Sequence, residues 1–266
     1  MSGAIRSELR KFFTTRLWWG MAIGVAVSAA LFAVLFGFVY TAGVSAEEME
    51  ASGMGSGSAA QIANSVYTGG LGVAYLLMLT IGVMQIGSEY RHKTITSTFL
   101  ATPRRWTAML AKVVSVSIIG AMYAVLSMIV SVAAGALVLN ARGFDPFPSG
   151  EVFRTIVLAL LVLAVWGLIG LGVGILIPNQ VAALLIGIGV AWIVEPLLAM
   201  GLRLWDFGAE YISPYLPSSA TQAALDAVVQ QGEHRIEWWA GALALIAWAA
   251  LFSGLGILRT VKQDIS

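Results

Sequence analysis

Long apolar runs separated by short polar segments dominate the sequence. Six runs reach about 20 residues, the length that an α-helix needs to cross the hydrocarbon core of a bilayer. They lie at 17–41, 68–88, 113–139, 155–177, 181–200 and 238–258. A transmembrane β-barrel would instead show alternating segments of about ten residues. The pattern therefore predicts an all-α polytopic membrane protein of six transmembrane helices, folded as a single domain over residues 1–266, with both termini on one side.

The composition agrees with this class. The 266 residues are 59% hydrophobic and 11% charged, and the mean hydropathy is +0.86, outside the range of soluble domains. The 15 Lys and Arg residues are scattered among the loops, so we expect no nucleic-acid partner. The absence of Cys excludes disulfides, thiolate metal sites and cysteine nucleophiles.

The basic residues predict the orientation, because Lys and Arg concentrate on the cytoplasmic side of membrane proteins. Eleven of them fall on the side of the termini and four on the other side. The first group is Arg6, Arg10, Lys11, Arg16, Arg91, Lys93, Arg104, Arg105, Lys112, Arg259 and Lys262, and the second is Arg142, Arg154, Arg203 and Arg235. We therefore expect a multi-pass protein of the plasma membrane with both termini cytoplasmic.

A cleaved signal peptide is the competing interpretation of the first run, because Val44-Ser45-Ala46 resembles a cleavage site. The apolar run before it is about 25 residues long, against 7–15 in signal peptides, which favours a retained helix. Before this run, apolar residues recur every three to four positions between Gly3 and Leu17. The spacing predicts an amphipathic helix over 1–16 at the membrane surface, unless the basic residues serve only as a topology signal.

Two outside loops are long. The Gly- and Ser-rich segment Gly43–Ser65 is typical of a flexible loop. The segment 201–237 mixes apolar helical pieces with breakers, and such loops commonly dip into the membrane interface or cap a cavity. Ser218 or Ser219 is a candidate N-cap for a helix there. In the fourth run, Gly170 and Gly174 form a small-residue face for which packing within the chain is favoured.

Several kinds of chemistry are missing. The chain has no P-loop motif, so ATP-driven work would need a second polypeptide. His92 and His234 are expected on opposite sides of the membrane, which disfavours a shared metal site or an intramembrane serine protease. Glu47 and Glu48 lie in a loop, which disfavours a membrane-embedded glutamate metalloprotease. We therefore predict no catalytic residue, metal or cofactor on this chain.

One carboxylate, Glu195, lies inside an apolar run, followed by Pro196. A buried ionisable group in a membrane is a candidate functional residue because holding it in lipid is costly. It is either a group of the substrate path or gate, or it has a structural partner such as Arg203 or a freed backbone amide.

The second connection, residues 89–112, is dense in polar and basic residues. It places the charges of Glu89, Arg104 and Arg105 beside the apolar Phe99 and Leu100. Charge pairing around an apolar anchor is what a transient protein interface needs. The alternative is that these basic residues only fix the topology.

Three sequence strings resemble the permease subunits of ABC-2-type exporters, in particular actinobacterial members. They are Glu89-Tyr90-Arg91-His92-Lys93-Thr94-Ile95 with the following Thr98–Arg105, Asn179-Gln180-Val181-Ala182-Ala183, and Val194-Glu195-Pro196-Leu197. Together with the six runs, the resemblance covers essentially the whole chain. The family usually carries Gly or a similar small residue at the position of Lys93.

The resemblance implies an elbow helix near Ser2–Arg16, a coupling helix within about Ser97–Trp106, and partly re-entrant outside helices before the last span. It also implies a homodimer or pair of permeases in the lipid bilayer, with two ABC ATPase subunits that carry ATP and Mg. The residues that it assigns to ATPase coupling are Glu89, Tyr90, Arg91, Thr94, Phe99, Leu100, Ala101, Thr102, Pro103, Arg104 and Arg105.

We therefore predict a non-enzymatic membrane subunit of an exporter for an amphipathic or lipid-like substrate, such as a drug, antibiotic, lipid or glycan. A helical channel that needs no nucleotide is the alternative, and a membrane-embedded hydrolase ranks third.

Overall fold

The structure is a computed structural model that describes residues 1–42, 56–101, 104–225 and 236–262. Within these ranges the chain is helical and has no strands. Six helical stretches are long and apolar enough to cross a membrane. The predicted all-α class and the number of candidate spans are therefore confirmed.

The helices follow one another from α1 to α13. Their bounds are α1 Ser2–Phe13, α2 Leu17–Thr41, α4 Ser56–Thr68, α5 Leu71–Arg91, α6 Ile95–Ala101, α7 Arg105–Ala141, α8 Glu151–Leu176, α9 Gln180–Gly189, the π-helix η1 Val190–Val194, α10 Glu195–Leu202, α11 Asp206–Tyr211, the 3₁₀ helix η2 Ser213–Tyr215, α12 Pro217–Leu225 and α13 Trp238–Lys262.

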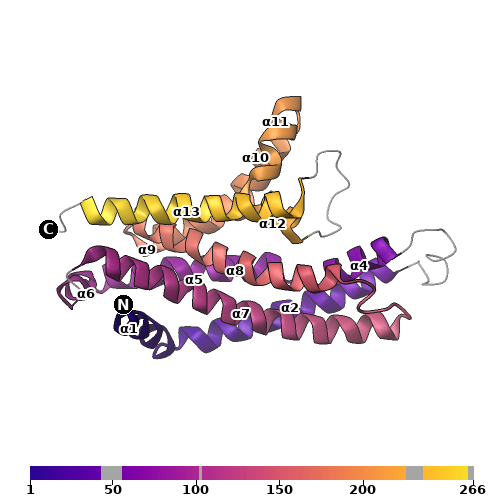
Figure 1. Ribbon diagram of the computed structural model, residues 1–266, viewed down its shortest axis with the longest axis horizontal. Helices are drawn as coiled ribbons and strands as arrows, with labels where there is room; N and C mark the ends of the chain where they lie inside the picture. The colour runs from indigo at the N-terminus through magenta and orange to yellow at the C-terminus, as the bar shows by residue number, and fades with distance from the viewer. Residues whose placement is uncertain (43–55, 102–103, 226–235, 263–266) are drawn as a thin grey trace.

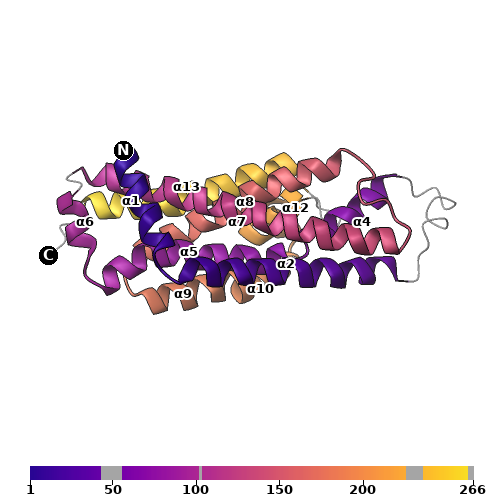
Figure 2. The ribbon, with the colours of Figure 1, turned by 90° about the horizontal axis from the view of Figure 1, so that it is seen from below.

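The long helices lie side by side along the longest axis of the molecule (Figure 1). Helix α1 runs across the bundle at one end, the same end that holds α6 and the last turns of α13 (Figure 2). Helix α4 and the connection from α7 to α8 lie at the opposite end. The chain thus gathers α1, α6 and the end of α13 at one end of the bundle, as an even number of spans requires.

Helices α5 and α8 form the centre, and glycines bring them together. A Cβ on Gly82 would lie 2.0 Å from the carbonyl oxygen of Gly167, and one on Gly170 would lie 2.1 Å from that of Leu79. A Cβ on Gly174 would meet the Val83 backbone at 3.0 Å. Packing within the chain is therefore confirmed for the small-residue face of the fourth span.

Two helices are longer than expected. The second span covers 59–91 rather than 68–88, because Ala60 and Ala63, which the sequence places in a flexible loop, are buried. Helix α7 begins at Arg105 rather than 113. Lys112 therefore lies in a helix, where its side chain is completely buried, and not in a connecting loop.

The fifth span has the smallest buried share of the six. Helix α9 packs against α5 and α8, whereas α10 and α11 extend away from the bundle (Figure 1). The π-helical turn η1 lies directly before Pro196, and the amide of Glu195 bonds five residues back to the carbonyl of Val190. Because proline has no N–H, the preceding turn changes register there instead of continuing the α-helical pattern.

Candidate functional site

Four charged side chains meet at the end of the bundle that holds α1. The Lys112 ammonium lies 2.8 Å from Glu8 Oε2 and 2.7 Å from Glu89 Oε1. The Lys11 ammonium lies 2.7 Å from Glu8 Oε1 and 2.6 Å from Glu89 Oε1. We call this set of Glu8, Lys11, Glu89 and Lys112 the ion cluster. It joins α1, α5 and α7.

Three of the four members of the ion cluster are buried. Lys112 has no exposed side-chain surface, and Glu8 and Glu89 are each 4% exposed as residues. Two positive and two negative charges balance, which offsets the high cost of removing ions from water. The second oxygen of Glu89, Oε2, is also buried and has no hydrogen-bond partner among the described residues. Glu89 therefore keeps an unused acceptor beside the network.

Helix α1 docks through a face that is partly charged. Glu8 is buried one turn before Phe12, whose ring meets that of Tyr123 edge-on at 6.2 Å. The Tyr123 hydroxyl donates a 2.6 Å hydrogen bond to the carbonyl of Trp18. The amphipathic helix exists as the spacing predicts, but two charges of its polar face, Glu8 and Lys11, point into the protein.

Lys11 is the half-exposed member of the ion cluster and the link to α6. Burial lowers the pKa of Lys11. Hydrogen bonds to Glu8 and Glu89 and attraction to their charges together raise it by more, so the pKa lies above its ordinary value. Its ammonium also lies 3.5 Å from the Thr98 hydroxyl of α6. Lys11 is thus charged at physiological pH and connects the cluster to the short helix.

The turn between α5 and α6 has a defined geometry. The amide of Lys93 donates to the carbonyl of Tyr90, and the amide of Thr94 donates to that of Glu89, with Lys93 at a φ of 56°. These bonds form a Schellman motif, in which the left-handed position usually carries Gly. The same motif ends α7, where Gly143 has a φ of 81°. The position at which the resembling family carries a small residue is therefore a left-handed one here.

Phe99 and Leu100, the two large apolar residues of the coupling prediction, face different ways in helix α6. Phe99 packs against the end of the bundle, and the Arg105 guanidinium lies 5.6 Å from its ring. Arg105 also donates to the carbonyl of Thr260 in α13. Leu100, in contrast, is 77% exposed. Of these two residues, Leu100 is therefore the one that presents its apolar side chain outward.

The remaining residues of the coupling prediction lie around this point. Tyr90 packs against the same apolar end as Phe99, whereas Arg91, Thr94 and Arg104 are exposed. Ala101 is the last residue of α6, and Thr102 and Pro103 lie outside the described residues.

Sequence reasoning found Glu89 but missed its partners. Glu8 lies among the polar residues of the predicted amphipathic helix, where the spacing gives it no further role, and Lys112 is counted only as a topology charge. One signal was available: Lys112 follows Ala-Met-Leu-Ala and precedes Val-Val, so an unbroken helix from Arg105 places it among apolar residues. A lysine there needs an acidic partner, but its identity is not local information.

Glu195 lies at a second polar site, far from the ion cluster along the fifth span. Its Oε1 accepts a hydrogen bond from the backbone amide of Ser218 in the first turn of α12, and the residue is 5% exposed. Helix α12 is also tied to α8, because the Trp166 indole donates to the Thr221 hydroxyl at 2.9 Å. The geometry matches the backbone-amide alternative for Glu195, since a carboxylate at a helix N-terminus satisfies amides that have no partner in the helix.

Within the described ranges, no group of three or more His, Asp or Glu side chains is arranged to hold a metal ion. No protein-family model and no curated protein matches the chain. The proposed function therefore rests on the sequence strings and on the geometry of the ion cluster and α6.

Proposed function

We propose that this chain is the membrane-spanning subunit of an ABC-2-type exporter, driven by two ATPase subunits that dock on α6. The observation that carries this proposal is the buried ion cluster, which ties α1, α5 and α7 together directly behind the exposed tip of α6. The sequence strings of the connection 89–112 support the family, and the positive-inside bias supports a cytoplasmic location for this end.

The ion cluster makes this end suitable for transmitting a force. Separating a buried charge from its partner is costly, so α1, α5 and α7 move together when α6 is displaced. Glu89 lies in the last turn of α5, and this helix runs through the centre of the bundle, where its Gly82 packs closely against α8. A movement of the tip therefore reaches the two most buried spans of the protein.

The tip itself fits a protein partner. Leu100 supplies an exposed apolar side chain, and Arg91, Lys93 and Arg104, which flank α6 in the sequence, are exposed basic groups. A central apolar anchor inside a charged rim is the usual anatomy of an interface. The complementary surface on an ATPase would be an apolar groove with an acidic rim.

The described residues of one chain form six candidate spans, and its sequence has no P-loop, so we propose a complex of two permease copies and two ATPase chains in the plasma membrane. The cargo would be an amphipathic or lipid-like molecule that leaves the cytoplasm between the two copies. The other class, a nucleotide-independent channel, needs no ATPase partner, which separates the two functions experimentally.

The test is to search the neighbouring reading frames for an ABC ATPase and to measure its co-purification with this chain, the native mass and the rate of ATP hydrolysis. We expect a complex of two plus two chains. Leu100→Ala removes the exposed anchor and should weaken capture by more than about 1 kcal/mol. Phe99→Ala should instead lower the stability of the permease itself, because Phe99 packs on its own chain.

Wild-type association by Leu100→Ala, or full transport by a monomer without ATPase, would refute the proposal. Arg104→Glu tests the rim, and its effect should be largest at low salt, because charge repulsion is then unscreened.

A further inference from the structure

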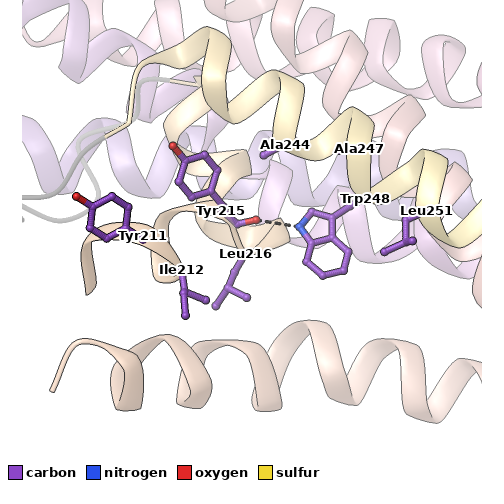
Figure 3. Close-up of a pocket in the computed structure, with 8 residues that line it drawn as sticks. All are labelled: Tyr211, Ile212, Tyr215, Leu216, Ala244, Ala247, Trp248 and Leu251. Carbon is purple, nitrogen blue, oxygen red and sulfur yellow. Dashed lines mark hydrogen bonds between the residues drawn. The ribbon is translucent and has the colours of Figure 1, made fainter. Parts of the chain in front are cut away.

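An apolar groove lies between the segment that follows α10 and the last span, α13. Its volume is about 500 Å³. Figure 3 shows the residues that line it: Tyr211, Ile212, Tyr215, Leu216, Ala244, Ala247, Trp248 and Leu251. None of these eight residues carries a charge. The groove is independent of the ion cluster and of the proposed ATPase surface.

The walls of the groove are fixed by hydrogen bonds. The Trp248 indole donates a 2.8 Å hydrogen bond to the carbonyl of Tyr215, which joins the two walls (Figure 3). The carbonyl of Leu216 accepts from the amide of Ala220, and the amide of Ser218 is held by Glu195. The polar backbone groups next to the groove are therefore engaged, and what remains open is an apolar surface.

The groove lies at a depth where lipid chains are the solvent. Helix α13 begins at Trp238, which is exposed together with Trp239, as expected of aromatic residues at a membrane interface. At a rise of 1.5 Å per residue, Ala244 and Leu251 lie about 9 and 20 Å farther along the helix. Both positions are inside a hydrocarbon core of about 30 Å.

An aromatic ladder stands beside the groove. The rings of Trp205 and Phe207 are 5.2 Å apart and those of Phe207 and Tyr211 are 5.1 Å apart, and all three side chains are more than half exposed. The amphipathic rings of Trp and Tyr, here Trp205 and Tyr211, settle at the headgroup level. The ladder ends at Tyr211, which also lines the groove. The surface at the level of the lipid headgroups is therefore continuous with the surface at the level of the acyl chains.

We propose that the groove holds one acyl chain of a membrane phospholipid, whose headgroup lies at the aromatic ladder. Position, chemistry and volume favour this occupant, because the groove opens inside the hydrocarbon region, carries no charge and has the size of a small-molecule site. An unfilled cleft would forfeit dispersion contacts along both walls, and a flexible chain restores them.

The test uses the purified full chain in nanodiscs that contain a phospholipid with a mid-chain diazirine. After irradiation, lipid adducts are mapped by mass spectrometry. We expect adducts concentrated on the peptides that carry Tyr215 and Trp248. Ala247→Trp fills the groove and should reduce those adducts by about tenfold, because the indole takes the volume of the chain.

The matched control is Ile246→Trp, at an exposed residue of the same helix that does not line the groove. It should leave the adduct pattern unchanged, and equal thermal stability of the two variants excludes misfolding as the cause. Adducts spread evenly over α13 and insensitive to Ala247→Trp would show ordinary surrounding lipid and overturn the proposal.

A second copy of the chain in the groove would also overturn it. The protein has no cysteine, so Leu251→Cys introduces a unique thiol in the groove. We expect no disulfide-linked dimer from this variant under mild oxidation. Efficient dimer formation, together with absent lipid adducts, would assign the groove to a permease interface.

Discussion

Replacing Lys112 by methionine tests whether the ion cluster holds the end of the bundle together. Methionine has a similar length and no charge, so it keeps most of the packing and removes the ammonium. Glu8 and Glu89 then share only Lys11, whose side chain is 41% exposed. The buried cluster changes from neutral to a net charge of −1.

The expected loss follows from this geometry. Removing one partner of a buried ion pair costs about 3–5 kcal/mol, because the other charge remains buried and uncompensated. Each carboxylate here keeps one contact with Lys11, so we expect the lower end, about 3 kcal/mol of unfolding free energy. Adding Glu8→Gln to Lys112→Met restores neutrality and should recover at least about 1 kcal/mol.

The assay is equilibrium unfolding of the purified protein in mixed micelles, with the same variants tested for ATPase-stimulated transport. Lys93→Met is the control, since it removes an exposed lysine and should change stability by no more than about 0.5 kcal/mol. The reasoning fails if Lys112→Met matches this control, or if the charge-balanced double variant is no more stable than Lys112→Met alone.

Two further predictions concern backbone positions. Lys93→Gly should stabilise the protein by about 0.5–1 kcal/mol relative to Lys93→Ala in the same unfolding assay, because both remove the charge but only Gly relieves the left-handed conformation; equal stability of the two variants would contradict the Schellman motif. Glu195→Ala should cost about 1–2 kcal/mol by leaving the Ser218 amide uncapped, whereas Glu195→Gln keeps an acceptor and should lose much less. If Glu195→Gln abolishes transport at unchanged stability and assembly, Glu195 is a gating or substrate group instead.

The sequence determined the class of the protein and the number of its candidate spans. Length and hydropathy of a run are local properties, and a helix satisfies its own backbone within the run. The ends of the helices were harder to predict from the sequence, because polar and small residues continue a helix when neighbouring helices bury them. Ala60 and Ala63 extend the second span for this reason, and Lys112 lies inside α7 rather than in a loop.

Part of the candidate site was also readable from sequence. The connection 89–112 does form a short helix between two spans, at the same end of the bundle as α1. Which of its apolar residues faces outward was not readable, because Phe99 and Leu100 are adjacent and equally apolar. The docking of Phe99 against the bundle and against Arg105 decided that Leu100 is the exposed one.

Only the tertiary structure decided the partners of the buried charges. Glu8 and Lys112 are 104 residues apart, and Glu195 caps a helix that begins 22 residues later. A charged residue in an apolar stretch of a membrane protein indicates that a partner is present, because burying an isolated charge is too costly. Which group supplies that partner depends on how helices distant in sequence pack against one another, and no local pattern encodes it.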